Sequence, residues 1–275
     1  MEVILRFEHV CKRFGDDVAL DDVTFSIPEG DTRIVFGAAG SGKSVMLKTA
    51  VGLVRPDSGH VWLFGEDITQ MKEERLFGLR SRVGILFQEG GLFDSLTVRE
   101  NVEYPLLNQQ RLGEEQLRLS PEEIDRRVRE ALRFVELEHT LDKYPSELSG
   151  GMRRRVGIAR ATVTQPRLVL YDSPTAGLDP ITANTIIALI IKARDLQKTT
   201  SILVTHRYQD GHLLANYRYN QEKGQLEPAP RDTGIHERTL FMVFRKGRLI
   251  FEGTQEELEA ARDPYLSKFK MARPA

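Results

Sequence analysis

Short runs of apolar residues recur along the chain, and each ends at a polar or glycine-containing segment. The clearest runs are residues 32–36, 83–87, 168–171 and 201–205. Runs that are short and apolar throughout are typical of strands buried on both faces, as in parallel sheets. Open sheets of this kind bind ligands beyond the carboxyl ends of their strands. The pattern therefore predicts an α/β fold with its site at these strand ends.

A helical period replaces these runs in the middle of the chain, over about residues 91–164. Its clearest helix begins at Ser120, which we expect to be the N-cap, with Pro121 in the first turn and Glu123 closing a capping box. The apolar residues that follow share one face at helical spacing: Ile124, Val128, Ala131, Leu132 and Val135. We expect that face to be part of a core.

These patterns divide the chain into layers. Residues 1–30 and 58–66 predict an antiparallel β layer, with a turn at 57–60. Residues 31–90 and 165–206 predict the α/β core, on either side of the helical part in the sequence.

The last third of the chain is more polar. Residues 207–238 contain Pro and Gly, and part of this segment is expected to be an inserted loop. Regular structure resumes with a hairpin at 240–251 about the turn 245–247. We expect one domain over residues 1–255, its core formed by 1–90 and 165–255, followed by a C-terminal extension at 256–275 whose residues 264–269 pack or dock.

Composition narrows the function classes. Hydrophobic residues make up 40% of the 275 residues and charged residues 29%, which is ordinary for a globular protein. The net charge of −1 gives no general attraction to nucleic acid or anionic lipid. One cysteine, Cys11, fits a reducing compartment. The start lacks the layout of a signal peptide, and no apolar run is near the roughly 20 residues that span a bilayer, so we expect any membrane role to come through a partner.

A glycine-rich loop joins the run 32–36 to a helical pattern. It comprises Gly37, Ala38, Ala39, Gly40, Ser41, Gly42, Lys43 and Ser44, followed by Val45. Strand, loop and helix in this order form a phosphate-binding loop, whose backbone N–H groups approach phosphates. Lys43 is expected at the β- and γ-phosphates of ATP and Ser44 at Mg²⁺. The alternative is a glycine-rich turn with a surface lysine.

A second strand end carries a carboxylate. Asp172 follows the run 168–171, and we expect it to hold Mg²⁺, although it could instead cap the next helix. The next position, where a nucleotide site of this kind would hold a carboxylate to activate water, is Ser173.

A second anion site is predicted at residues 148–152. There Ser149, Gly150 and Gly151 open a helix, whose N-terminus attracts anions. Since one ATP does not need two γ-phosphate clamps, we expect this segment to act on nucleotide held by a partner subunit. The arginines at 153–155 are expected to form a solvated helix face.

With these motifs in order, the chain resembles the nucleotide-binding subunits of ABC transporters over about residues 3–260. The resemblance implies an ABC-type P-loop fold with a RecA-like core, an antiparallel β layer and a helical subdomain. It implies that Gln88 touches Mg²⁺ and senses the membrane partner, Asp179 lies in the dimer interface, His206 contacts the γ-phosphate and Phe14 stacks on adenine. It also implies a homodimer that works with integral membrane permease subunits.

Residues 92–106, 171–181 and 263–269 resemble the ATPases of Mla-type systems, which move phospholipids together with MCE-domain proteins. The resemblance implies such a partner and a place on the cytoplasmic side of the bacterial inner membrane. Leu92, Phe93 and Leu96 are expected either to form the dock for the permease or to belong to the core. A soluble ABC protein acting on ribosomes or DNA is the alternative class, and it usually carries paired cassettes or long coiled coils.

The hydroxyl at Ser173 leaves the hydrolytic step open, because it cannot accept a proton at neutral pH on its own. Three interpretations remain. Hydrolysis persists slowly, or with another base such as His206 acting through water. The residue is an engineered change that traps ATP. Or the protein is an ATP-gated binding module with little turnover.

Overall fold

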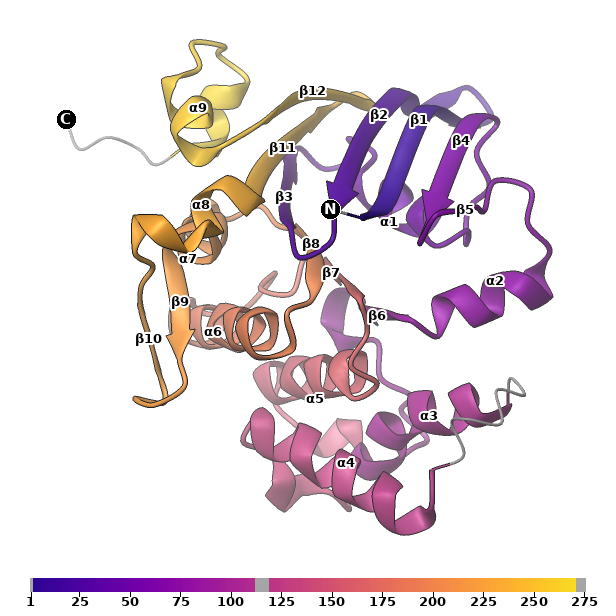
Figure 1. The fold of residues 1–275 in the computed structure, drawn as a ribbon, viewed down its shortest axis with the longest axis vertical. Helices are drawn as coiled ribbons and strands as arrows, with labels where there is room; N and C mark the ends of the chain where they lie inside the picture. Colours follow the sequence, from indigo (N-terminus) through magenta and orange to yellow (C-terminus); the bar gives the residue numbers. More distant parts are fainter. Residues whose placement is uncertain (1, 112–118, 271–275) are drawn as a thin grey trace.

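A six-stranded sheet forms the centre of the protein in a computed structural model that describes residues 2–111 and 119–270 (Figure 1). Its strand order is β12-β11-β3-β8-β7-β6, and every neighbouring pair is parallel except β11 with β12. The strands are β3 (Thr32–Gly37), β6 (Val83–Leu86), β7 (Leu168–Asp172), β8 (Thr200–Val204), β11 (Thr239–Arg245) and β12 (Arg248–Gly253). The predicted α/β fold and the C-terminal hairpin are confirmed.

An antiparallel sheet in the order β2-β1-β4-β5 covers one side, as predicted. It comprises β1 (Val3–Phe14), β2 (Asp17–Pro28), β4 (Ser58–Leu63) and β5 (Glu66–Asp67). The predicted turn at 57–60 is wrong, because β4 begins at Ser58, which pairs with Cys11. Gly59, at φ +83°, lies so close to β1 that a Cβ would be 2.3 Å from the His9 carbonyl oxygen. A polar segment with a glycine is therefore an irregular strand here and not a turn.

Helix α1 (Lys43–Ala50) packs between the two sheets. Successive residues of β3 face opposite cores: Val35 packs with α1 and the antiparallel sheet, whereas Ile34 and Phe36 face the helical side. Because both faces of β3 are covered, the strand is apolar throughout, as its sequence predicts.

The helical layer lies below the central sheet in Figure 1. It contains α3 (Val98–Arg111), α4 (Pro121–Phe134) and α5 (Gly150–Thr162), while α2 (Glu73–Arg80) precedes β6. Ser120 caps α4 by accepting a hydrogen bond from the Glu123 N–H, as predicted. The Glu123 carboxylate accepts hydrogen bonds from Arg126 and Arg127. Four residues of the predicted apolar face are buried: Ile124, Val128, Leu132 and Val135.

Most of residues 207–238 have regular structure, in contrast to the loop predicted for part of this segment. It contains α7 (Tyr208–Asn216), a hairpin of β9 (Tyr217–Asn220) and β10 (Gln225–Pro228), and α8 (Ile235–Arg238). The hairpin packs Tyr217, Tyr219 and Leu226 against the core beside α6 (Pro180–Gln197). Polar residues in this segment pair with each other, as Arg218 does with Glu227.

The described C-terminal residues pack on the core, one of the two outcomes expected for 264–269. Helix α9 (Gln255–Ala260) leads to the 3₁₀ turn η6 (Leu266–Phe269), and Leu266 is buried. Within residues 2–111 and 119–270, none of the helices has the length and apolar character needed to cross a membrane.

Candidate nucleotide site

Four neighbouring strands bring the predicted site residues to one edge of the central sheet. Strands β3, β8, β7 and β6 are parallel and adjacent, so their carboxyl ends lie side by side. The phosphate loop follows β3, His206 follows β8, Asp172 ends β7 and Gln88 follows β6. His206 and Gln88 are exposed at this edge.

Lys43 closes the phosphate loop on itself. Its Nζ donates hydrogen bonds to the carbonyl oxygens of Gly37 and Ala38, each at 2.8 Å, and to Ser41 Oγ at 3.2 Å. Burial lowers the pKa of Lys43, and the nearby carboxylate of Asp172 opposes that shift. The loop thus holds a buried ammonium group among oxygen atoms, which an anionic ligand would stabilise.

Glycine is required at two loop positions. A Cβ on Gly37 would lie 2.6 Å from the Phe244 carbonyl oxygen, and one on Gly42 would lie 2.2 Å from the Ala19 carbonyl oxygen. Gly42, at φ +102°, is the N-cap of α1, and it provides no side chain to cap the helix. The first turn of α1 also contains no acidic residue. Its N–H groups and partial positive charge therefore suit a phosphate group.

The residues expected at Mg²⁺ lie together. Ser44 and Asp172 line one small cavity between α1 and β7. A hydroxyl, a carboxylate and the nearby amide of Gln88 are oxygen donors, which Mg²⁺ prefers. Among residues 2–111 and 119–270, there is no group of three or more His, Cys, Asp or Glu residues that could hold a metal ion. One carboxylate and two neutral donors fit a cation held mainly by phosphate oxygens and water.

Ser173 lies directly against the expected Mg²⁺ ligand. It is 6% exposed, and its Oγ donates a hydrogen bond to Asp172 Oδ1 at 3.2 Å. Its backbone has φ +52°, the left-handed region that is uncommon outside glycine. Its N–H donates a hydrogen bond to the Val204 carbonyl oxygen at 2.9 Å. This bond between the ends of β7 and β8 fixes the backbone conformation of Ser173.

Ser149 lies in a different layer from the phosphate loop. It caps α5 by accepting a hydrogen bond from Met152 N–H at 3.2 Å, and its side chain is exposed. Helix α5 belongs to the helical layer, whereas α1 packs between the sheets (Figure 1). Gly151 is buried beside Thr182, and a Cβ added to Gly151 would lie 2.6 Å from Thr182 Cγ2. A single chain therefore does not bring its own residues 149–151 to its own phosphate loop.

Two other predicted residues lie at element ends. Asp179 caps α6 by accepting hydrogen bonds from the N–H groups of Ile181 and Thr182, each at 3.0 Å. Phe14 ends β1, is 51% exposed and has Lys12 Nζ 5.3 Å from its ring centre. The exposed ring face of Phe14 is compatible with stacking on a base.

The arginines at 153–155 are not simply a solvated face. Arg154 is 7% exposed and donates a hydrogen bond to the Ala176 carbonyl oxygen, so the prediction is wrong for this residue. It thereby connects α5 to the loop that precedes α6. Sequence reasoning missed this residue because a run of three arginines has the polarity of a surface.

Asp210 is a buried carboxylate that sequence reasoning missed. It is 0% exposed, and its Oδ2 accepts hydrogen bonds from Thr175 and Thr205 Oγ1, each at 2.6 Å. Arg207 Nη1 forms an ion pair with Asp210 Oδ1 at 3.2 Å. Burial raises the pKa of Asp210 above its ordinary value. Asp210 therefore joins the loop after Ser173 to the strand end that carries His206.

The fold and these strand ends define a class. A model of the ABC transporter family matches residues 20–176, which is more than half of the chain. The chain belongs to the ABC transporter family, as an ATP-binding protein, and its ligands are ATP and Mg²⁺.

Particular relatives fall within this class. The chain is 33% identical over 273 residues to the probable ribonucleotide transport ATP-binding protein mkl of Mycobacterium leprae, covering 99% of this chain and 70% of that protein. It is 39% identical over 211 residues to the methionine import ATP-binding protein MetN of Bifidobacterium longum, covering 74% of this chain and 51% of that protein. The match thus spans about half the length of MetN.

Solved structures give the same fold. The ATP-binding cassette MJ0796, in a dimeric post-hydrolysis state bound to ADP and Pi, matches with a TM-score of 0.74 and 29% identity, covering 91% of this chain and 98% of that one. CbiO1 from Clostridium perfringens, part of the ABC transporter complex cbiONQ, matches with a TM-score of 0.75 and 27% identity, covering 95% and 92%.

Proposed function

We propose that two copies of this chain close head to tail over two ATP molecules and thereby drive a membrane permease. The observation that carries the proposal is the split site: Lys43 and Asp172 lie at one sheet edge, whereas Ser149 is exposed in another layer. A second copy would complete the site with its own Ser149 and helix N-terminus. The dimeric state of the MJ0796 cassette supports this arrangement.

Each residue has a role in that cycle. Lys43 would exchange the carbonyl oxygens of its own loop for the β- and γ-phosphates. Ser44 and Asp172 would hold Mg²⁺, which neutralises phosphate charge when bound. Gln88 would link the cation to the permease, and His206 would contact the γ-phosphate. Phe14 would stack on adenine.

Ser173 makes the hydrolytic step slow in this proposal. A positioned general base contributes about 10²–10⁴-fold to a rate. The Ser173 hydroxyl is not a base at neutral pH, and it is already bonded to Asp172. His206, exposed at the neighbouring strand end, would act through water as the replacement base.

The test compares Ser173→Glu with Ser173→Gln in the full chain purified with its permease. Both variants have nearly the same volume and the same backbone strain at φ +52°, but only one has a carboxylate. We expect the Glu variant to hydrolyse ATP at least about tenfold faster than both the wild type and the Gln variant. Equal rates for the Glu and Gln variants would show that the missing base does not limit the rate.

A second candidate function is an ATP-gated binding module with little turnover. Ser173 favours it, because its hydroxyl donates to Asp172 and supplies no proton acceptor for hydrolysis. Binding of ATP and Mg²⁺ needs no such acceptor. This candidate predicts a wild-type complex that keeps unhydrolysed ATP and remains closed. Single-turnover release of phosphate from the wild type on the time scale of transport would exclude it.

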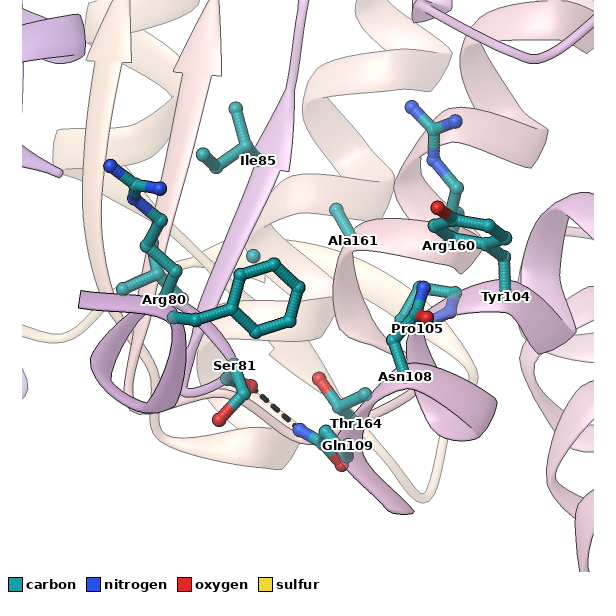
Figure 2. Close-up of a pocket in the computed structure, with 13 residues that line it drawn as sticks. Arg80, Ser81, Ile85, Tyr104, Pro105, Asn108, Gln109, Arg160, Ala161 and Thr164 are labelled. Atoms are coloured by element: carbon teal, nitrogen blue, oxygen red, sulfur yellow. Dashed lines mark hydrogen bonds between the residues drawn. The ribbon is translucent and has the colours of Figure 1, made fainter. Parts of the chain in front are cut away.

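A groove beside the site would receive the permease. A cavity of about 220 Å³ opens between α2, β6, α3 and α5 (Figure 2). Arg80 and Ser81 lie on one side of it and Tyr104 and Arg160 on the other, with Gln109 Nε2 donating a hydrogen bond to the Ser81 carbonyl oxygen. Arg160 also donates a hydrogen bond to the carbonyl oxygen of Gly90, two residues after Gln88. A permease segment in this groove would therefore reach the Gln88 loop.

The segment at 92–96 divides between the expected roles. Phe93 is 43% exposed and packs on Tyr104 at the edge of that groove, so we assign it to the dock. Leu92 is half-buried and packs against the core, and Leu96 is also half-buried.

For the substrate we propose phospholipid, with an MCE-domain protein as a further partner on the cytoplasmic side of a bacterial inner membrane. The resemblance of residues 92–106 and 263–269 to Mla-type ATPases supports this choice. The names of mkl and MetN point to ribonucleotide and methionine instead. The test measures the ATPase activity of the chain with its permease in nanodiscs. Added phospholipid, ribonucleotide or methionine should each stimulate this activity only if it is the substrate. Stimulation by either small solute but not by phospholipid would reject the lipid assignment.

A further inference from the structure

The C-terminal segment reaches the phosphate loop through one tyrosine. Tyr265 Oη accepts a hydrogen bond from the Ala38 N–H at 3.2 Å and donates one to the Phe244 carbonyl oxygen at 3.0 Å. Ala38 is the second residue of the loop, and Phe244 pairs with Gly37 across β11 and β3. The hydroxyl therefore bridges the loop to the neighbouring strand.

Local structure fixes this tyrosine in place. Asp263 Oδ1 accepts hydrogen bonds from the N–H groups of Tyr265 at 2.7 Å and Leu266 at 3.1 Å. The Phe269 ring packs edge-on against Tyr265, with centroids 5.3 Å apart, and stacks on Phe36 at 5.7 Å. Phe36 lies in β3 directly before Gly37, so the segment contacts the end of β3 through the Phe269 ring and the loop through the Tyr265 hydroxyl.

Two side chains thus hold the first turn of the loop. Lys43 binds the carbonyl oxygens of Gly37 and Ala38, and Tyr265 binds the N–H of Ala38. When Lys43 moves to the phosphates, its contact with Ala38 is lost. Of these two side chains, Tyr265 is then the one that still restrains Ala38.

We propose that Tyr265 is a positioning residue for ATP, which keeps Ala38 and the start of the phosphate loop in the binding conformation. The proposal rests on the ATP-binding role of the loop. It gives residues 263–269 a part in nucleotide affinity in addition to their packing. Restraining the loop before the ligand arrives lowers the entropy cost of binding.

The test is Tyr265→Phe in the full chain, which keeps the ring packing and removes the hydroxyl. We expect the Kd for Mg-ATP to rise about threefold to tenfold, as for the loss of one hydrogen bond. We also expect faster amide hydrogen exchange over residues 36–43 in the nucleotide-free protein. The second measurement is independent of whether ATP is hydrolysed or any permease is driven.

Tyr208→Phe is the matched control. Tyr208 donates a hydrogen bond to Glu259 and accepts one from Gln255, so its hydroxyl is engaged in similar chemistry without contacting the loop. This variant should leave both the Kd and the exchange of residues 36–43 unchanged. An unchanged Kd for Tyr265→Phe, with or without a lower Tm, would overturn the proposal and leave Tyr265 with a packing role alone. Failure of the wild type to bind Mg-ATP would refute the nucleotide site itself, and the exchange of the free loop would still report on the tyrosine contact.

Discussion

At the scale of residues, Asp210 makes the strand ends of the site sensitive to pH. Its folded-state pKa is raised by burial, whereas in the unfolded chain it is near its ordinary value of about 3.9. Ionising it therefore costs more free energy in the folded protein. Its contribution to stability is largest below pH ~4, falls as pH rises through the folded-state pKa, and is constant above it.

Asp210→Asn removes this titration and keeps an oxygen that can accept from Thr175 and Thr205. We expect the free energy of unfolding of the variant, relative to the wild type, to increase as pH rises through that window. Urea unfolding at a series of pH values from 4 to 8 measures the difference. A difference that does not change with pH would show that the folded protein does not disfavour the charged carboxylate.

The sequence predicts some residues of the site far better than others. Lys43 and Ser44 are recognisable because a glycine-rich loop carries them from an apolar strand into a helix, and Asp172 because it ends an apolar strand. Asp210 and Arg154 are not, because each is buried by partners from distant elements. Polarity along the chain does not reveal such partners. The backbone strain of Ser173 was likewise not visible before the strand packing was known.

At the scale of elements, the hairpin β9–β10 shows how a polar segment becomes ordered. Tyr219 pairs with Leu226 across the two strands. The Tyr219 N–H also donates a hydrogen bond to Asp195 Oδ2 at 2.7 Å. Only one face is apolar, and that face packs on α6, whereas the turn is exposed. The sequence predicted a loop because the apolar residues are few and the structure that covers them lies elsewhere in the chain.

Tyr219→Ala should therefore destabilise the protein and not only the hairpin. The side chain packs against the core, with Lys192 Nζ 5.5 Å from its ring centre. We expect a loss of about 1–2 kcal/mol for a half-buried aromatic ring, which lowers Tm by roughly 2–6 °C in a chain of this size. Calorimetry compares it with Glu222→Ala in the exposed turn, which should change Tm by less than about 1 °C. Equal effects of the two changes would show that the hairpin is not coupled to α6.

At the scale of the whole molecule, the division between the phosphate loop and Ser149 predicts an assembly that depends on nucleotide. Mg-ATP should double the mass measured by light scattering when hydrolysis is slow. Ser149→Arg adds a cation and bulk at an exposed helix N-terminus, so it should prevent the dimer and leave Mg-ATP binding to the monomer unchanged.

Binding by titration and mass by light scattering separate these two effects. Arg153→Ala, one turn further along α5, is the control and should still dimerise. A Ser149→Arg variant that dimerises with Mg-ATP like the wild type would rule out residues 149–151 as part of the interface.

The global arrangement was predictable only in part. Apolar runs ending in polar residues indicate a parallel sheet, which is confirmed, and they predict the edge at which ligands bind. The strand order was not accessible, because β3, β7 and β8 have nearly the same buried pattern, and such strands fit equally well beside one another.

The pairing of β3 with β11 has a consequence for how the protein is made. Thr32 lies beside Thr239, so about 200 residues must be synthesised between the two neighbours. At about 5–20 residues per second, the edge of β3 waits roughly 10–40 s on the ribosome before its partner emerges. During that time an apolar strand with unpaired backbone groups is exposed to other nascent chains. A chaperone that covers residues 32–36 is therefore expected to matter more for the yield of this protein than for its final stability.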